Sequence, residues 1–280
     1  MREAEYRRLL DVVIEVAEVA GKKLLEYRTE NSSMVREQTK KDGTIVTEAD
    51  CSSNQLILDL LGRAYPDVGI FSEESPRDPR YRTVDSLFVV DPLDGTNQFI
   101  RGLSDFTVSI AFTEREGRFH RPTLGVVYRP VGKDMYFAVR GCGAWHRSRS
   151  GDLQRLNVSQ VNDWSRARLV CSRLRSDPAT ERLRASVGTC TGRGSAALMI
   201  CLVAQGKFEW YAHAAGRHLA EYDVCAAGII LEEAGGRLGH ATGASIRYNR
   251  VDPKMKNGVV AASEILFDRA VATMRELSLP

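Results

Sequence analysis

The pattern of apolar and polar residues predicts two helices near the start of the chain. Apolar side chains recur at helical spacing over residues 3–28, at Leu10, Val13, Ala17, Ala20 and Leu24. These positions share one face and charged residues occupy the other, so an amphipathic helix is expected. Apolar pairs within residues 56–61 predict a second helix after Asp50, which Tyr65-Pro66-Asp67 would end.

Strand patterns dominate from residue 68 to residue 146. Residues 68–71 and 87–90 are continuous apolar runs, whereas residues 106–112 alternate between apolar and polar or small side chains. Further apolar segments, separated by Gly, Pro and charged turns, are residues 124–128, 135–139 and 144–146. The series fits a meander of antiparallel strands.

Strands and helices alternate after about residue 150, which is the pattern of an α/β arrangement. The predicted strands are residues 168–172, 208–211 and 258–261. The predicted helices are residues 195–204, 222–233 and 264–277, with Gly235-Gly236 ending the second. We therefore expect two halves that pack as one body: an α+β half over residues 1–150 and an α/β half over residues 151–280.

Composition and charge narrow the class of protein. The 280 residues are 43% hydrophobic and 27% charged, which suits a globular chain with a sizeable core. The 39 basic and 36 acidic residues leave a net charge of +3, too balanced for nucleic acid as the main partner. No apolar run approaches the ~20 residues that span a bilayer, and the N-terminal segment lacks a signal-peptide core. We expect a cytoplasmic protein with no membrane partner.

Six cysteines are spread widely along the sequence. None of them forms a CxxC pair. This argues against both a zinc site and a disulfide framework, so six reduced thiols are expected. They are Cys51, Cys142, Cys171, Cys190, Cys201 and Cys225.

Two aspartates directly follow the predicted strand 87–90, in Asp91-Pro92-Leu93-Asp94-Gly95-Thr96. Pro92 cannot continue a central strand, so the chain is expected to turn there, and a short helix can begin at Gly95-Thr96. Two carboxylates on one turn, beside the amides of a helix start, suggest a metal cation paired with a phosphate. An aspartate at a turn more often caps the backbone of that turn, so this motif alone does not establish a metal site.

Other acidic residues lie at equivalent places in the predicted fold. Glu73-Glu74 follows the strand 68–71, Asp50 precedes a helix, and Asp223 lies in the first turn of an otherwise apolar helix. Asp50 and Asp223 could simply complement the helix dipole, a contribution of about 0.3–1 kcal/mol each. That explanation is less convincing for four acidic sites that all fall at strand ends or helix starts.

Four blocks, taken together, resemble the inositol monophosphatase superfamily of magnesium-dependent, lithium-sensitive phosphatases. They are residues 47–50 (Thr-Glu-Ala-Asp), 72–75 (Ser-Glu-Glu-Ser), 91–96 with Phe99 following, and 222–228 (Tyr-Asp-Val-Cys-Ala-Ala-Gly). Their order and rough spacing match the family from about residue 35 to residue 263. The resemblance implies a layered α/β/α/β/α sandwich, as in inositol monophosphatase and fructose-1,6-bisphosphatase. The metal motifs would lie in the first half, and the second half would complete the active site.

The resemblance also implies a role for individual residues. The implied metal ligands are Glu73, Asp91, the carbonyl of Leu93, Asp94 and Asp223. The implied catalytic residues are Asp50, Thr96 and Glu73, with Asp50 and Thr96 orienting and deprotonating the attacking water. The implied substrate-binding residues are Gly95 and Thr96, through their amides, together with Ser195 and His213.

Elementary electrostatics supports a metal cofactor in this arrangement. A phosphate dianion would be repelled by the carboxylates unless divalent cations intervened, and no Cys or His is placed to favour zinc. We expect two or three Mg²⁺ ions, with Mn²⁺ as a possible substitute. The family commonly has Trp where this chain has Tyr222, and Gly where it has Ser72; both changes preserve the carboxylates.

The substrate is expected to be a small phosphate ester. No nucleic acid polymer is expected as a partner, and a homodimer is a possible assembly. Aligned without gaps, His213 occupies the position of a glutamate that contacts ring hydroxyls in inositol monophosphatases. Residues 91–100, 106–111, 125–130 and 172–173 look closer to the 3′(2′),5′-bisphosphate nucleotidase branch, whose substrate is 3′-phosphoadenosine 5′-phosphate. The alternatives are inositol-1-monophosphatase and, after it, histidinol-phosphate or fructose-1,6-bisphosphate phosphatase.

Cations for a second phosphate could come from an arginine-rich run or from Lys40 and Lys41, although solvated surface explains such residues equally well. The arginines are Arg166, Arg168, Arg173, Arg175, Arg182 and Arg184. Two further hypotheses are a catalytically inactive relative that binds phosphorylated ligands and an RNA-binding protein. The complete acidic set and Thr96 disfavour the first, and the lack of interleaved aromatic residues disfavours the second.

Overall fold

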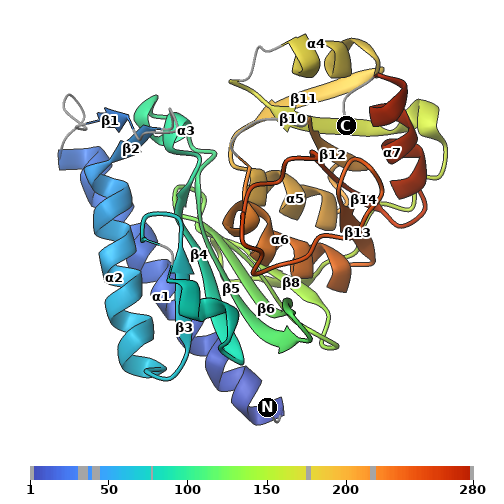
Figure 1. The fold of residues 1–280 in the computed structure, drawn as a ribbon. Coiled ribbons are helices and arrows are strands. Elements are labelled where there is room, and N and C mark those ends of the chain that lie inside the picture. The colour runs from blue at the N-terminus through green and yellow to red at the C-terminus, as the bar shows by residue number, and fades with distance from the viewer. Residues whose placement is uncertain are drawn as a thin grey trace.

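Helices and sheets stack in five layers, in the order α/β/α/β/α that the resemblance implied (Figure 1). The computed structural model describes residues 3–30, 37–39, 45–76, 78–174, 178–214 and 219–277. Two sheets, one of seven strands and one of five, form the second and fourth layers. No helix in these ranges is long and apolar enough to cross a membrane.

Two helices cover the outer face of the seven-stranded sheet. They are α1 (Glu3–Glu30) and α2 (Glu48–Ala64), as the helical periodicity predicted. Val13 and Ala17 of the apolar stripe of α1 are fully buried, as are Ala20 and Leu24, and Leu10 is partly buried. The stripe packs on side chains such as Phe88 and Val90, which point to this face of the sheet.

The seven strands of the first sheet follow one another in chain order. They are β3 (Gly69–Ser72), β4 (Ser86–Asp94), β5 (Thr107–Glu116), β6 (Phe119–Arg129), β7 (Asp134–Val139), β8 (Ala144–Arg147) and β9 (Leu153–Arg155). β3 is parallel to β4, and the remaining pairs are antiparallel, which confirms the predicted meander. A short 3₁₀ helix (Pro79–Arg82) connects β3 to β4.

Two apolar helices form the middle layer. α5 (Ala196–Ala204) is buried on every side, and α6 (Glu221–Glu233) is buried over nearly all of its length, because both lie between the sheets. They pack on Leu87 and Val89, which alternate along β4 with the residues that face α1 and α2. The middle layer therefore places the start of α6 near the end of β4.

The five-stranded sheet completes the second half. Its order is β11 (Thr189–Arg193), β10 (Arg168–Ser172), β12 (Trp210–His213), β14 (Val259–Ser263) and β13 (Gly236–Gly239). β11, β10 and β12 are parallel, and β14 runs antiparallel to both of its neighbours. The outer helices are α4 (Pro178–Ala185) and α7 (Phe267–Glu276).

The remaining elements are short. They are the hairpin β1 (Glu37–Thr39) and β2 (Ile45–Thr47), the helix α3 (Thr96–Ile100) and a 3₁₀ helix (Trp164–Arg166). The division into residues 1–150 and 151–280 stays a prediction. Strand β9 extends the first sheet beyond residue 150, and α6 packs on β5 and β6 of that sheet.

The expected turn at Pro92 is wrong, because β4 continues through Pro92 to Asp94. The pairing of β4 with β3 stops at Val90, so beyond that residue β4 has β5 as its one neighbour. The register with β5 is also irregular between Asp91 and Asp94. Pro92 is tolerated there because neither β3, whose pairing has ended, nor β5, whose register is irregular, needs a backbone N–H from this residue.

Candidate metal centre and substrate cavity

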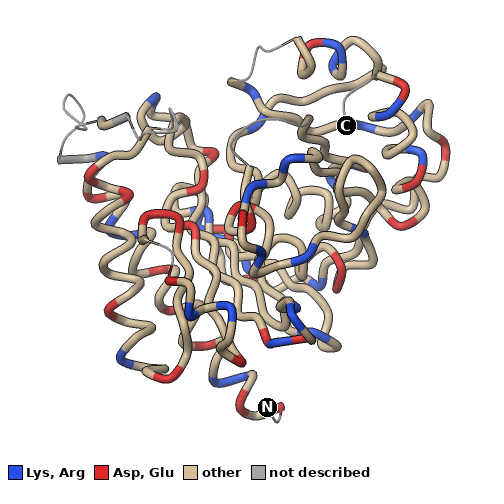
Figure 2. The backbone as a smooth tube through the Cα atoms, viewed as in Figure 1, with Lys and Arg blue, Asp and Glu red and all other residues tan. Residues whose placement is uncertain are grey.

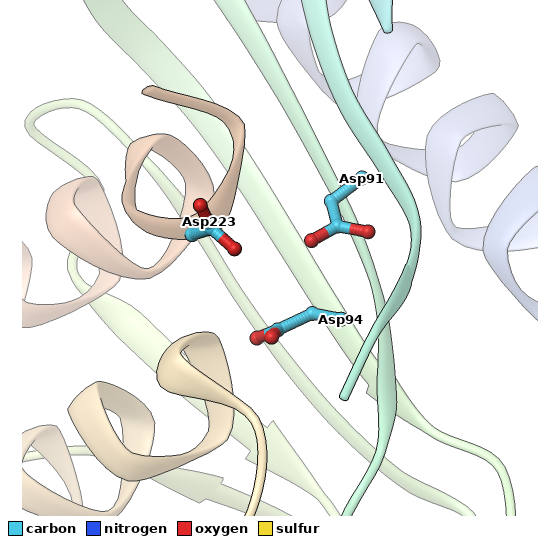
Figure 3. A group of neighbouring side chains, drawn as sticks. All are labelled: Asp91, Asp94 and Asp223. Atoms are coloured by element: carbon cyan, nitrogen blue, oxygen red, sulfur yellow. The ribbon is translucent and has the colours of Figure 1, made fainter. Parts of the chain in front are cut away.

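Three aspartates from two elements converge where β4 ends and α6 begins. Asp91 and Asp94 extend from β4, and Asp223 extends from the first turn of α6 (Figure 3). Each offers one carboxylate oxygen, and these oxygens all lie within 4.8 Å of one another. Asp223 is fixed by the backbone N–H of Ala220, which donates to its Oδ2 at 2.6 Å. The structure thus brings together three of the predicted metal ligands.

Asp91 is the most constrained member of this cluster. It is 1% exposed, its Oδ1 accepts from the N–H of Leu93 at 3.0 Å, and its Oδ2 has no hydrogen-bond partner within the described ranges. Burial raises the pKa of Asp91 well above its usual range, and the charges of Glu73, Asp94 and Asp223 raise it further. A divalent cation would relieve this repulsion and give the orphaned oxygen a ligand, so the donor set fits a hard metal ion.

Glu73 approaches the cluster from the loop after β3. Its backbone N–H donates to the carbonyl of Val90 at 3.1 Å. Ser72 donates to Asn54 of α2 at 2.6 Å, and Asn54 donates to Ser75 at 3.2 Å, so both ends of the Ser-Glu-Glu-Ser block are tied to α2. Glu73 lies outside the tight group of three, and its charge acts on Asp91. Its metal-binding and catalytic roles stay predictions.

Asp94 is held by the start of α5. Ser195 Oγ donates to Asp94 Oδ2 at 2.6 Å, and the N–H of Ala197 donates to the same oxygen at 2.7 Å. Ser195 caps α5 through Leu198 and contacts Thr107 Oγ1 at 2.9 Å, with its backbone at a positive φ of 58°. Burial raises the pKa of Asp94, whereas these hydrogen bonds lower it. Ser195 therefore orients a metal-ligand candidate; its predicted contact with substrate is a separate expectation.

Replacement of Ser195 by alanine is expected to weaken metal binding. Groups that orient metal ligands are typically worth about 10–100-fold in affinity, and Asp94 would lose one of its two positioning hydrogen bonds. The Mg²⁺ concentration that half-saturates the site should rise by that factor. The matched control is Ser263→Ala on β14, since that buried hydroxyl has no hydrogen-bond partner among the described residues. Equal Mg²⁺ dependence of the two variants would contradict this role.

Asp50 and Thr96 meet beside the cluster. Thr96 Oγ1 lies 3.0 Å from Asp50 Oδ1 and 3.3 Å from the carbonyl oxygen of Leu93, and its hydroxyl can donate to either. The other oxygen of Asp50 accepts from Thr47, from its N–H at 2.8 Å and its hydroxyl at 2.5 Å, in a capping box that begins α2. Burial raises the pKa of Asp50 to about 6, against the lowering effect of the Thr47 hydrogen bonds.

Gly95 forms the left-handed turn between β4 and α3. Its φ of 101° is in a region that favours glycine, and an added Cβ would lie 3.1 Å from the carbonyl of Asp105 and 3.2 Å from Gln98 Oε1. The turn places the hydroxyl of Thr96 against Asp50. The predicted contacts of the Gly95 and Thr96 amides with phosphate stay predictions.

A cavity of about 210 Å³ opens beside the three aspartates. Its lining includes Asp94, Gly95, Ser195, His213 and Asp223, all of them residues that the sequence had placed in the site. His213 ends β12 and is 8% exposed. Apolar side chains also line it, from Leu174, Leu183, Met199, Tyr211 and Leu219.

Several of the arginines expected to supply cations have partners within the fold. Arg168 makes a bidentate ion pair with Glu209, which is fully buried, at 2.9 and 3.0 Å. Arg173 pairs with Asp105 at 3.0 Å, and Arg184 pairs with Glu181 at 2.6 Å. Arg166 and Arg182 are exposed, whereas Arg175, Lys40 and Lys41 lie outside the described residues. In the view of Figure 2, basic and acidic residues are interspersed along the described chain.

Thr47, Asn54 and Thr107 support the site, and none of them was given a role from the sequence. Thr47 and Asn54 fix Asp50 and the Glu73 loop, and Thr107 contacts Ser195. A signal existed for Thr47, because Thr-x-x-Asp before an apolar run is the sequence of a capping box. The other two act through tertiary contacts that no local pattern reports.

The raised pKa values predict how stability depends on pH and metal. A carboxyl group whose pKa is higher in the folded chain, as for Asp50 at about 6 against 3.8, stabilises the fold below the unfolded pKa. That stability is lost as pH rises through the folded pKa, so the metal-free protein should lose stability between about pH 4 and pH 6. Mg²⁺ should therefore raise the Tm more at pH 7.5 than at pH 5, measured by thermal unfolding against EDTA. Equal increments at both pH values would contradict this coupling.

Comparisons with known proteins agree with this geometry. The model of the inositol monophosphatase family matches residues 5–279. A 3′(2′),5′-bisphosphate nucleotidase CysQ from Aggregatibacter actinomycetemcomitans is 30% identical over 262 residues, which cover 90% of this chain and 93% of that protein. The crystal structure of CysQ from Bacteroides thetaiotaomicron has a TM-score of 0.75 and 28% identity, covering 92% and 97% of the two chains. The structure of an inositol monophosphatase from Anabaena has a TM-score of 0.78 and 25% identity, covering 99% and 98%.

Proposed function

The chain belongs to the inositol monophosphatase family of phosphatases, and we propose that it hydrolyses a 3′(2′),5′-bisphosphate nucleotide with Mg²⁺ as cofactor. The substrate would be 3′-phosphoadenosine 5′-phosphate, and the products would be AMP and inorganic phosphate. One observation carries the chemistry: the Asp91, Asp94 and Asp223 cluster lies beside the Thr96–Asp50 pair, and Asp94 and Asp223 line a cavity.

The acidic cluster would hold the metal. Asp91, Asp94 and Asp223 supply hard oxygen donors, and Glu73 with the carbonyl of Leu93 would complete the coordination of two Mg²⁺ ions, with a third during turnover and Mn²⁺ as a substitute. When bound, such ions neutralise the phosphate charge and lower the pKa of water. No cysteine or histidine belongs to the described cluster, which favours Mg²⁺ over Zn²⁺.

Thr96 and Asp50 would carry the proton of the attacking water. Thr96 donates to Asp50, so the lone pairs of its hydroxyl oxygen can accept from a water molecule while its own proton moves to Asp50 Oδ1. A pKa of about 6 leaves Asp50 ionised at neutral pH and makes it a stronger base than an exposed carboxylate. The Thr47 hydrogen bonds keep its other oxygen occupied, so the proton has one destination.

Gly95, Thr96, Ser195 and His213 would position the ester. The first two present backbone amides at the turn that begins α3, and the other two line the same cavity. The phosphate to be cleaved would lie at the acidic end, with the nucleoside extending toward α4. The carboxylates that line this cavity within the described residues, Asp94 and Asp223, are then engaged by metal rather than by hydroxyl groups of the substrate.

Two observations favour a nucleotide over a polyol phosphate. Leu174, Leu183, Met199, Tyr211 and Leu219 give part of the cavity lining an apolar character that suits a flat heterocycle. The relative from Aggregatibacter actinomycetemcomitans, 30% identical, is a 3′(2′),5′-bisphosphate nucleotidase. The similarity to an inositol monophosphatase structure favours inositol 1-phosphate as the second candidate.

A panel of esters assayed side by side tests the proposal. Phosphate release with Mg²⁺ should be faster from 3′-phosphoadenosine 5′-phosphate than from inositol 1-phosphate, histidinol phosphate or fructose 1,6-bisphosphate, by at least about tenfold in kcat/KM. A higher kcat/KM for inositol 1-phosphate would overturn the substrate assignment. Absence of Mg²⁺-dependent release from every ester, together with binding of the bisphosphate, would instead support the ligand-binding hypothesis.

A further inference from the structure

Two cysteines that are 19 residues apart in sequence meet on neighbouring strands, close to the cavity. β10 and β11 run parallel, with Leu169 opposite Cys190 and Cys171 opposite Gly192. The Sγ atoms of Cys171 and Cys190 lie 2.7 Å apart. A disulfide has an S–S bond of about 2.05 Å, so a small side-chain displacement would bring the two sulfurs to bonding distance.

The surroundings of the pair distinguish the two thiols. Arg184 of α4 places its Nε 3.5 Å from Cys171 Sγ. The pKa of Cys171 is lowered to about 6, first by the hydrogen bond that Cys190 donates and then by Arg184. Donating that hydrogen bond raises the pKa of Cys190. Cys171 is therefore the thiolate and nucleophile at neutral pH, and Cys190 is the protonated partner.

The other described cysteines lack these features. Cys201 and Cys225 are completely buried, and burial raises the pKa of each well above the usual thiol value. Cys51 and Cys142 are exposed. Among the described residues, the group of His, Cys, Asp or Glu side chains that could hold a metal ion is the acidic cluster at Asp91. The two sulfurs therefore do not belong to a metal site in this part of the chain.

One member of the pair, Cys171, also lines the substrate cavity. Cys171 and the next residue, Ser172, both line it, as does Leu183 of α4. Arg184 contacts Cys171 Sγ and also donates to the carbonyl of Ser172. A change in the charge or position of the Cys171 sulfur therefore acts directly on the wall that faces the substrate.

We propose that Cys171 and Cys190 form a reversible oxidation site in the cavity wall, converted to a disulfide by a peroxide and restored by a dithiol. The Cys171 thiolate attacks one peroxide oxygen; the S–O bond forms, the O–O bond breaks, and the departing hydroxide is protonated to water. The Cys190 sulfur then attacks the resulting sulfenic acid, forms the S–S bond and releases a second water that carries the thiol proton. Two thiols lose two electrons in total, and the peroxide is reduced to two waters.

Oxidation should weaken substrate binding more than it slows the chemistry. The disulfide removes the thiolate that Arg184 contacts and draws the Cys171 sulfur toward β11, so the wall beside Ser172 rearranges. Neither sulfur belongs to the acidic cluster. We expect KM for the ester to rise several-fold while kcat changes little.

Thiol counting and peptide mapping test the bond itself, whatever the substrate is. The reduced full chain is treated with hydrogen peroxide and the free thiols are titrated, after which peptides are mapped by mass spectrometry without reduction. The expected result is a loss of two thiols per chain, a peptide linked through Cys171 and Cys190, and full recovery with dithiothreitol. Cys142→Ser should retain the linkage, and Cys190→Ser should abolish it and leave a sulfenic acid at Cys171 that dimedone traps.

Two outcomes would overturn the proposal. Linkage through other cysteines, or persistence of both thiols after peroxide treatment, would show that the pair is not an oxidation site. An unchanged KM in fully linked wild-type enzyme would remove the connection to the cavity. Because the mapping uses no substrate, inactivity toward 3′-phosphoadenosine 5′-phosphate would count against the proposed function and leave the oxidation site supported.

Discussion

Replacement of Asp91 by asparagine is expected to abolish most phosphatase activity while making the metal-free protein more stable. Asp91 is buried, its Oδ2 has no hydrogen-bond partner in the described chain, and three neighbouring carboxylates raise its pKa. Asparagine keeps the shape and the acceptor for Leu93 but removes the charge that the metal requires. We expect kcat/KM to fall by about a thousandfold or more. Each kcal/mol of relieved repulsion should raise the Tm in EDTA by about 2–4 °C.

A surface aspartate provides the matched control for this substitution. Asp268 on α7 is 92% exposed and its ion pair with Arg237 is 3.4 Å long, so Asp268→Asn should change neither activity nor Tm appreciably. Thermal unfolding is measured in EDTA and in Mg²⁺, because the gain should appear without metal and vanish or reverse with it. An Asp91→Asn protein that turns over at the wild-type rate would remove Asp91 from the metal site. A lower Tm in EDTA would show that the carboxylate supports the fold.

The acidic cluster was predictable because its members adjoin apolar segments of the sequence. Asp91 follows an apolar run, and Asp223 stands in the first turn of an apolar helix, where a carboxylate is costly without a partner. The layering then follows from the apolar faces: α6 must be covered on both sides, and this brings its N-terminus to the end of β4. The two aspartates are more than 130 residues apart in sequence, and burial alone accounts for their proximity.

Elements with weak apolar patterns could not be predicted in this way. Strand β11, with the sequence Thr-Cys-Thr-Gly-Arg, is largely half-buried, and α4 is short and polar; neither carries a clear period. The contact between Cys171 and Cys190 depends on the parallel pairing of β10 with β11, so the spacing of the cysteines could not reveal it. The same holds for Glu209, whose buried carboxylate pairs with Arg168 of β10.

The hydrogen-bond partners of a side chain are a further feature that could not be predicted from the sequence. Ser195 was expected in the substrate site, and it does line the cavity, yet its hydroxyl is engaged by Asp94, Thr107 and the start of α5. The helix start is recognisable from the apolar run that follows it. The identity of the acceptor is set by how α5 packs against β4, and three-dimensional coordinates are needed to see it.

Replacement of Thr96 by alanine is expected to lower kcat by about 10²–10⁴-fold and to leave the Mg²⁺ dependence nearly unchanged. The hydroxyl of Thr96 lies 3.0 Å from Asp50 Oδ1, and its removal breaks the path by which a water proton reaches that carboxylate. The acidic cluster loses no ligand side chain. The measurement is a titration of activity with Mg²⁺ at saturating ester, which separates kcat from the metal requirement.

The comparison of variants decides whether Thr96 and Asp50 act as one unit. Thr96→Ser keeps the hydroxyl and should retain activity within about tenfold of wild type, whereas Asp50→Asn should fall as far as Thr96→Ala. Residues that act together are not additive, so the double variant should be no slower than either single variant. A multiplicative loss in the double variant would show that the two residues serve separate steps. A large shift in Mg²⁺ dependence for Thr96→Ala would mean that its contact with the Leu93 carbonyl, at 3.3 Å, shapes the metal site instead.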